Sequence, residues 1–302
     1  MRVITSHLAF PEGPIARPDG SVVLVEIQAG DVTEIAPDGT RRVIAHTGGG
    51  PNGAAIGPDG ACYVVNSGGW EYLQFGELAV PQSHLPEWHE GGSIQRVDLD
   101  TGVVTTLYTE CDGVPLTSPN DIVFDAAGGM WVTDHGREHQ RTRVLGCVYY
   151  AQPDGSSIRK AIAPVDSANG VGLSPDGRTL YVADTYSGRC NQWALAGPGE
   201  LETPNPVFGN GGGMFADPGG YRLFDSLAVE ANGNVVVASP SAGSICVFSP
   251  TGQLVDEVKF DDPIVTNICF GGPDLRTAYV TLSGTGRLVA MEWPRPGLRL
   301  AY

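Results

Sequence analysis

The chain has 302 residues, and its 18 Lys and Arg against 34 Asp and Glu give a formal net charge of −16. An acidic surface of this size repels phosphate backbones, so we expect no nucleic-acid partner. The N-terminal residues lack a basic segment followed by an apolar core, and no apolar run approaches membrane-spanning length. We therefore expect a cytoplasmic protein with no membrane association.

A cassette of strand, turn and strand recurs six times along the chain. The copy at residues 167–185, SANGVGLSPDGRTLYVADT, places apolar runs on both sides of a Pro-Asp-Gly turn, which is typical of a β-hairpin. Each copy begins with one polar residue, called an anchor here: Glu12, Asn52, Asn120, Asn169, Asp225 and Asn267. A glycine stands eight residues after every anchor except the last, where Leu275 takes its place. Such agreement in phase indicates a true internal repeat.

A later strand introduced by a glycine completes each unit, at Gly30, Gly92, Gly146, Gly188, Gly243 and Gly286. Four strands per unit predict a propeller blade, and six units predict an all-β, six-bladed β-propeller that forms a single domain over 1–302. Residues 2–6 also have strand character. We expect them to pair with residues 288–293 and so to close the ring and cover two sheet edges.

An insertion lengthens the second unit, since 68 residues separate its anchor from the next, against 40 to 56 elsewhere. Residues 68–92 are rich in aromatic side chains, among them Trp70 and Trp88. They form either a surface loop or a lid over the anchors, and a lid of this kind favours a substrate with apolar or ring surface. Glycine-rich residues 209–220 lack a phosphate-loop pattern and are expected to be a connecting loop.

The anchors are expected to meet around the axis of the propeller, because each begins the innermost strand of its blade. They comprise two carboxylates and four amides, which are hard oxygen donors suited to one divalent cation. We expect Ca²⁺, with Mg²⁺, Mn²⁺ or Zn²⁺ as alternatives. The competing interpretation is that Asn and Asp only cap turns.

The six cysteines show no Cys-x-x-Cys spacing of the kind that binds a metal ion.

Four motifs resemble the senescence marker protein (regucalcin) and gluconolactonase family: Pro11-Glu12-Gly13-Pro14, Pro119-Asn120-Asp121, Ala168-Asn169-Gly170 and the Asp225 position. That family consists of six-bladed propellers that hydrolyse sugar lactones with one divalent metal ion. The resemblance implies that Glu12, Asn169 and Asp225 are metal ligands. It implies that Asn120 contacts the metal or the substrate and that Asp121 is its neighbour in the site.

The chain departs from this family where the ligand aspartate is followed by Ser226 instead of glycine. Polar residues near the ends of the second strands, Asn66, Asp134 and Asp184, are expected either at the site or as hairpin caps. In the loop after Asp134, His135 and His139 are candidates for proton transfer near neutral pH. We also assign substrate contacts to Asn52, Asn120, Asp121, Trp70 and His135.

The expected function is a metal-dependent lactonase acting on a small molecule. The cation would polarise the lactone carbonyl, and water would attack after activation either on the metal or by Asp225, with Asp121 as a second catalytic residue. One alternative is a paraoxonase-like arylesterase or phosphotriesterase, or a lyase or isomerase, using the same site. Another is a non-catalytic propeller that binds calcium or a protein. The sequence does not indicate an oligomeric state.

Overall fold

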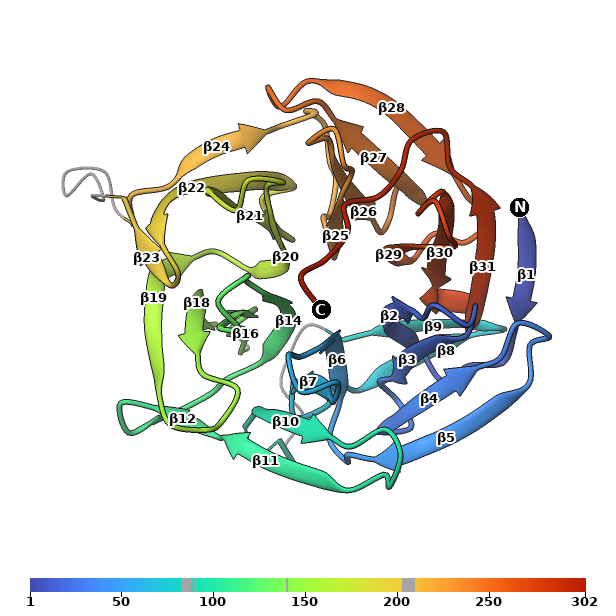
Figure 1. The fold of residues 1–302 in the computed structure, drawn as a ribbon, viewed down its shortest axis with the longest axis horizontal. Coiled ribbons are helices and arrows are strands. Elements are labelled where there is room, and N and C mark those ends of the chain that lie inside the picture. The colour runs from blue at the N-terminus through green and yellow to red at the C-terminus, as the bar shows by residue number, and fades with distance from the viewer. Residues whose placement is uncertain (83–87, 90, 140, 203–209) are drawn as a thin grey trace.

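The computed structural model describes residues 1–82, 88–89, 91–139, 141–202 and 210–302, and Figure 1 shows six small antiparallel sheets around one axis. Within these residues the only helix is a 3-10 turn, η1 (Ser283–Thr285). No described helix is long and apolar enough to span a membrane. The expected all-β, six-bladed β-propeller is confirmed.

The strands of each blade follow chain order from the axis outwards, except that the outermost strand of the last blade is the N-terminal β1. The first three blades consist of β2 (Pro11–Ala16), β3 (Val22–Glu26), β4 (Asp31–Ile35) and β5 (Arg41–His46); β6 (Pro51–Ile56), β7 (Cys62–Asn66), β10 (Ser93–Val97) and β11 (Val104–Tyr108); and β14 (Pro119–Phe124), β15 (Met130–Asp134), β18 (Gly146–Ala151) and β19 (Ile158–Val165). The last three consist of β20 (Ala168–Leu173), β21 (Thr179–Asp184), β22 (Arg189–Gly197) and β24 (Gly213–Ala216); β25 (Leu227–Val229), β26 (Val235–Ser239), β27 (Ser244–Phe248) and β28 (Leu254–Lys259); and β29 (Val265–Gly271), β30 (Thr277–Leu282), β31 (Arg287–Glu292) and β1 (Arg2–Thr5). Three two-stranded hairpins lie outside the blades: β8 (Tyr72–Phe75) with β9 (Leu78–Pro81), β12 (Glu110–Cys111) with β13 (Val114–Pro115), and β16 (Arg137–Glu138) with β17 (Arg143–Val144). The two-residue strand β23 (Glu200–Leu201) pairs with β22.

The N-terminal strand closes the ring, as predicted. Strand β1 pairs antiparallel with β31, with Arg2 opposite Ala290 and Val3 opposite Val289. The last blade therefore contains residues from both ends of the chain, and the edge of β31 is covered.

One stretch differs from its prediction. Residues 209–220 were expected to be only a connecting loop, yet β24 lies within them and pairs with β22. Phe215 is buried and its ring lies 4.8 Å from that of Tyr181. Apolar residues among the glycines thus supply an outer strand for the fourth blade; Gly209 itself lies outside the described residues.

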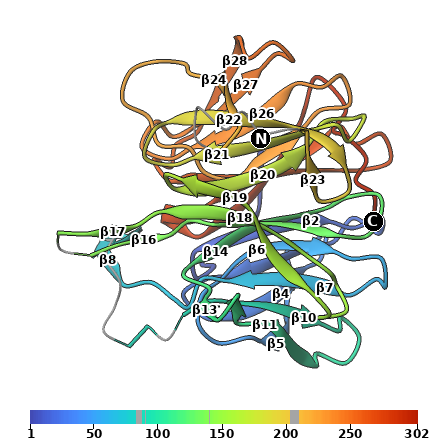
Figure 2. The same cartoon turned by 90° about the vertical axis from the view of Figure 1, so that its left-hand side faces the viewer.

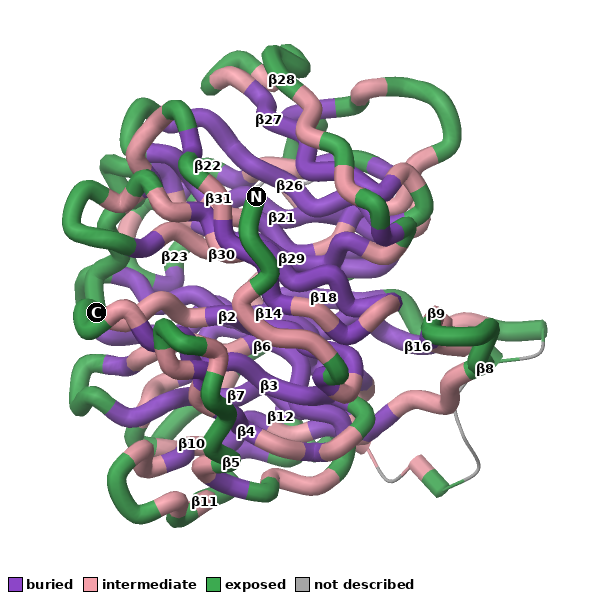
Figure 3. Tube along the Cα trace, turned by 90° about the vertical axis from the view of Figure 1, so that its right-hand side faces the viewer, coloured by how far each residue is buried: buried purple, intermediate pink, exposed green. Residues whose placement is uncertain are grey.

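Apolar clusters fill the spaces between neighbouring blades, and the second strands β3, β7, β15 and β26 are buried at every residue (Figure 3). Between the third and fourth blades, Trp131 and Val148 pack with Leu180 and Trp193. Successive side chains of a strand point to opposite faces, so continuous apolar runs such as 22–25 and 235–238 pack against the neighbouring blades on both sides.

The two faces of the propeller differ. The hairpins β8–β9 and β16–β17 project from one face, and the C-terminus lies at the other (Figure 2). On that second face, Leu298 donates its backbone N–H to Val229, and Tyr302 packs on Phe124 with ring centroids 6.0 Å apart. Since Phe124 ends an inner strand, the anchors lie at the hairpin face. The expected insertion thus contains β8–β9, while its residues 83–87 and 90 lie outside the described residues.

Candidate functional site

The six anchors occupy equivalent places at the beginnings of the inner strands. Glu12, Asn52, Asn120 and Asn169 are each the second residue of their strands, Asn267 is the third residue of β29, and Asp225 precedes β25 by two residues. Neighbouring inner strands contact one another all the way around the axis. The anchors are therefore brought together at one end of the axis.

The glycine that follows three of the anchors has a structural role. A side chain at Gly13, which has φ +52°, would place its Cβ 2.7 Å from the backbone oxygen of Asn52 in the next blade. At Gly170 the Cβ would lie 2.5 Å from the backbone nitrogen of Leu227. Glycine at these positions lets neighbouring inner strands approach closely and keeps the ring narrow.

Three anchor side chains leave a buried oxygen without a donor. Glu12 is 2% exposed, and its Oε2 accepts hydrogen bonds from Gly13 N (2.6 Å) and Asn267 Nδ2 (2.7 Å). Asn169 donates its Nδ2 to Thr185 Oγ1 at 3.0 Å. Glu12 Oε1, Asn120 Oδ1 and Asn169 Oδ1 receive no hydrogen bond from any described residue. Buried acceptors without partners are costly, so these oxygens indicate a ligand.

The carboxylates of the site act on one another. Burial, reinforced by the charge of Glu12, raises the pKa of Asp225 well above its ordinary value. Burial also raises the pKa of Glu12, against the stabilising hydrogen bond from Asn267. Burial is the first cause in Asp121 as well and raises its pKa to about 8. Glu12 and Asp121 are buried and Asp225 is half-buried, so these carboxylates repel one another unless a cation is present.

The donor set fits a divalent cation with a preference for oxygen. Glu12, Asn120 and Asn169 offer free oxygens from three different blades, and Asp225 is held within electrostatic reach of Glu12. Among the described residues there is no group of three or more His, Cys, Asp and Glu side chains arranged to hold a metal ion. Amide oxygens would therefore have to complete the coordination, as Ca²⁺ readily accepts.

Asp121 is fixed by the backbone on both of its oxygens. Oδ1 accepts the N–H of Ile122 at 2.9 Å, and Oδ2 accepts the N–H of Val171 in the next blade at 3.1 Å. Ser226, where the family usually has glycine, is buried and lies close enough to Asp121 to lower its pKa. The substitution thus leaves the Asp225 position in the ring and adds a hydroxyl near Asp121.

The second set of polar residues caps hairpins. Asp134 accepts the backbone N–H groups of Thr117, Ser118 and Gly136. Asn66 Oδ1 likewise accepts from the backbone at 2.8 and 3.0 Å, and Asp184 Oδ1 accepts the Ser167 hydroxyl at 2.7 Å. The capping interpretation therefore accounts for these side chains.

Residues from three loops cover the anchors. His135 Nε2 lies 3.2 Å from Thr185 Oγ1, and its ring is 6.2 Å from that of Trp70. Burial lowers the pKa of His135 to about 3, so its imidazole is neutral at pH 7. His139, in contrast, is exposed. Trp70 and His135, the two candidate substrate contacts in these loops, thus lie side by side. The hydrogen bond to Thr185 and the edge-to-face contact between the two rings fix the position of His135.

The sequence assigned no individual role to three members of this cover, Tyr72, Arg137 and Thr185, although Tyr72 belongs to the aromatic residues of the insertion. Arg137 lies in the loop after Asp134, but we expected no function for it, because a sequence does not show whether an arginine is buried. The signal available was the position of Tyr72 and Arg137 in the two loops that follow second strands at the anchor face.

Two cavities lie outside the ring of anchors. One of about 320 Å³ is lined by Asn66, Trp88 and Gln95 among others, and one of about 160 Å³ is lined by Trp193 and Asn210 among others. Neither contains an anchor, so the geometry of the polar oxygens, and not cavity size, locates the candidate site.

Comparison with known proteins places the chain in a family. Residues 10–284 match the SMP-30/Gluconolactonase/LRE-like region. The chain belongs to this family. It is 32% identical over 174 residues to lactonase drp35 of Staphylococcus epidermidis, covering 56% of this chain and 49% of that protein. It is 24% identical over 295 residues to the gluconolactonase of Zymomonas mobilis, covering 90% of this chain and 76% of that protein.

The fold is also that of solved structures. The calcium-binding protein regucalcin from Agrobacterium tumefaciens is similar with a TM-score of 0.73 and 20% identity, covering 99% of this chain and 97% of that chain. At this identity the similarity supports the propeller fold alone. The resemblance recognised in the sequence motifs is therefore confirmed at the level of family and fold.

Proposed function

We propose that this protein is a lactonase that requires one divalent cation, Ca²⁺ in the first instance. The observation that carries the proposal is the set of buried, unpartnered oxygens on Glu12, Asn120 and Asn169 beside Asp225. Relatives named lactonase and gluconolactonase support hydrolysis of a cyclic ester. Because the match spans only 49% of the length of the first of them, the substrate is itself part of the proposal.

The anchors would have two functions, binding of the cation and proton transfer. Glu12, Asn120, Asn169 and Asp225 would hold the cation, which supplies Lewis-acid polarisation of the lactone carbonyl when bound. Asp225 would also accept a proton from the attacking water, whose oxygen forms the new bond to the carbonyl carbon. The ring C–O bond breaks, and its oxygen leaves with a proton as the alcohol of a hydroxy acid.

The remaining residues would position the substrate. Asp121 is held rigidly by two backbone N–H groups and would accept a hydrogen bond from a substrate hydroxyl. Asn52 is buried in the ring between Glu12 and Asn120 in chain order and would contact the same molecule. Trp70 and the neutral His135 would cover the lactone and keep bulk water out.

The test is proton release from sugar, aliphatic and aromatic lactones, with chelator-stripped protein and after adding back Ca²⁺, Mg²⁺, Mn²⁺ or Zn²⁺. We expect turnover only with a cation, and a loss of about a hundredfold or more in Asp225→Asn, since its base is removed. Asp256→Asn changes an exposed carboxylate of the same blade and serves as the control. Circular dichroism checks that both variants are folded.

Several results would overturn the proposal. Turnover by Asp225→Asn near that of the unchanged protein would remove Asp225 from its role. If the protein hydrolyses aryl esters or phosphotriesters but none of the lactones, the site is that of an arylesterase or phosphotriesterase. Cation binding with no turnover of any substrate would favour a calcium-binding propeller.

A further inference from the structure

Arg137 is a buried cation with unused donors. Its side chain is 2% exposed, and its Nη2 donates to the backbone oxygens of Ser67 and Gly69, both at 3.1 Å. The guanidinium carbon lies 3.3 Å from the centroid of the Trp70 ring. A guanidinium has five N–H donors. Those on Nε and Nη1 meet no acceptor among the described residues.

No described carboxylate forms a direct ion pair with this cation, although the charge of Asp134 acts on it. Asp134 is the acidic residue nearest to Arg137 in the preceding strand, but its oxygens are occupied by the backbone N–H groups of Thr117, Ser118 and Gly136. Arg143, on the same hairpin, instead forms an ion pair of 2.7 Å with Asp166. A buried guanidinium whose Nε and Nη1 meet no described acceptor is unfavourable, so this side of Arg137 is suited to an anion.

The cation lies at the edge of the candidate site. Tyr72 has a buried hydroxyl with no hydrogen-bond partner among the described residues, and the charges of both Arg137 and Glu12 act on it. Its ring packs on Phe10, with centroids 5.0 Å apart, two residues before Glu12 in the chain. On the other side, His135 is linked through Thr185 to Asn169. Arg137 is thus separated from the ring of anchors by single side chains.

We propose that Arg137 binds a carboxylate of the substrate, so that the lactones opened here are those carrying an acidic group. This inference rests on the proposed function, because it assigns the substrate class of the same site. The lactone would lie over the anchors, with its carboxylate at the guanidinium and its ring beside Trp70. The cation would be engaged by the anchors and the lactone carbonyl, and the free donors of Arg137 then leave that end as the place for the carboxylate.

The electrostatics support this orientation. Burial lowers the pKa of Arg137 to about 9, so the guanidinium still carries its charge at pH 7. His135 beside it is neutral at that pH. Arg137 is therefore the cation that a substrate anion meets in this cover, and a charge-assisted hydrogen bond in a dry site is among the strong ones.

Two lactones that differ at one carbon test the proposal. D-Glucaro-1,4-lactone carries a carboxylate where D-glucono-1,4-lactone carries a hydroxymethyl group. We expect kcat/KM of the cation-loaded protein to be at least about tenfold higher for the acidic lactone, as one charged contact is worth this much. Arg137→Met should abolish the preference by raising KM for the acidic lactone. Arg143→Met, an equal charge change on the same hairpin, should keep it.

A binding measurement separates this inference from the lactonase proposal. Calorimetry compares D-galacturonate with D-galactose, which differ by the same carboxylate and contain no lactone, in protein with Ca²⁺ and in protein with chelator. We expect the carboxylate to bind at least about tenfold more tightly and Arg137→Met to remove the difference.

The outcomes are distinguishable. Equal turnover of both lactones, or an equal loss for both in Arg137→Met, would overturn the carboxylate subsite while the lactonase proposal stands. Galacturonate binding that depends on Arg137, without turnover of any lactone, would support the subsite and overturn the lactonase. Failure of galacturonate to bind better than galactose would overturn the subsite whichever reaction the protein performs.

Discussion

Glu12 illustrates how a single side chain is prepared for a ligand. One of its carboxylate oxygens is fixed by Gly13 and Asn267, and the other is buried without a donor. Hydrogen bonds on one oxygen orient the carboxylate, and the free oxygen is then aimed at a fixed place. Asn267 is thus better described as a residue that orients Glu12 than as a ligand itself.

Replacing Glu12 by glutamine should weaken Ca²⁺ binding by at least about tenfold, because a formal charge is removed from a ligand set with few charges. Calorimetric titration of chelator-stripped protein measures the dissociation constant. Glu292→Gln, the same change at an exposed residue that ends β31, is the control. If Glu12→Gln is folded and binds Ca²⁺ as tightly as the unchanged protein, Glu12 is not a ligand.

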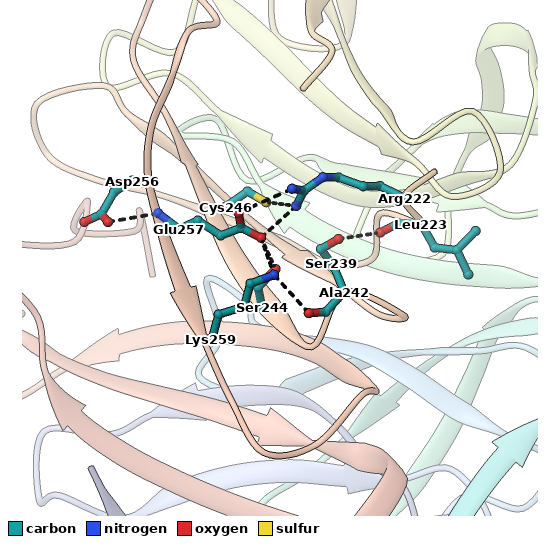
Figure 4. A network of polar contacts seen from close by, with 9 residues as sticks. All are labelled: Arg222, Leu223, Ser239, Ala242, Ser244, Cys246, Asp256, Glu257 and Lys259. Carbon is teal, nitrogen blue, oxygen red and sulfur yellow. Dashed lines mark hydrogen bonds and ion pairs between the residues drawn. The ribbon is translucent and has the colours of Figure 1, made fainter. Parts of the chain in front are cut away.

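At the scale of elements, the outer strand β28 is held to the fifth blade by a network of polar contacts (Figure 4). Glu257 on β28 accepts hydrogen bonds from Arg222 Nη1 (2.8 Å), Ser244 Oγ (2.8 Å) and Lys259 Nζ (2.8 Å). Arg222 also donates to Cys246 Sγ at 3.3 Å. An outer strand has backbone hydrogen bonds to a neighbouring strand on one side only, so side-chain contacts of this kind add stabilisation that a second neighbour would otherwise supply.

This network predicts a pH-dependent stability. Hydrogen bonds, first of all from Arg222, lower the pKa of Glu257 from 4.5 to about 2. The stabilisation is thus fully present above about pH 5 and is lost as the pH falls towards 2, where the folded state also takes up the proton. With allowance for its partial exposure, Glu257→Gln should lower the free energy of unfolding by about 2 kcal/mol at pH 7.

Urea unfolding of the Glu257→Gln variant and the unchanged protein between pH 7 and pH 3 measures this difference. We expect the two free energies of unfolding to converge as the pH falls. A difference that stays constant over this range would show that the ionised form of Glu257 has no special stabilisation in the folded state. Asp256→Asn, next to it on β28 and exposed, should change little at any pH.

At the scale of the whole molecule, the ring depends on contacts between the ends of the chain. Strand β1 completes the last blade, and Ile4 packs in a cluster with Leu24 and Leu288. On the other face, Glu230 is fully buried and accepts hydrogen bonds from Trp293 Nε1 (2.7 Å) and from Arg295. The first contact joins the last blade to the first, which are neighbours only because the propeller is closed, and the second fixes the C-terminal segment to the fifth blade.

Removal of residues 1–6 should therefore lower the melting temperature by several degrees and promote aggregation. Without β1, strand β31 becomes an unpaired sheet edge, and its apolar side chains become exposed. Differential scanning calorimetry and light scattering measure the two effects. Val3→Lys keeps the strand and changes only a side chain that is 49% exposed, so it should behave as the unchanged protein. An unaltered melting temperature after truncation would mean that β1 does not stabilise the ring.

The sequence by itself determined the blades, their number and the six anchors, because a repeat with period-2 strands and Pro-Asp-Gly turns encodes its structure locally. It also showed where the ring closes and which loops are long. It failed at β24, where three apolar residues between glycines carry too little periodicity to predict a strand. It also gave no role to Arg137.

Only the tertiary structure decided which polar side chains are satisfied. The sequence left Asn66 as either a site residue or a hairpin cap and placed Asn169 among the anchors; the structure shows that the first caps a hairpin and that the second keeps an oxygen without a described donor. The burial of Arg137 between Trp70 and two backbone carbonyls likewise depends on loops from different blades. Unpaired donors and acceptors are properties of neighbours far apart in the chain, and therefore no local pattern can reveal them.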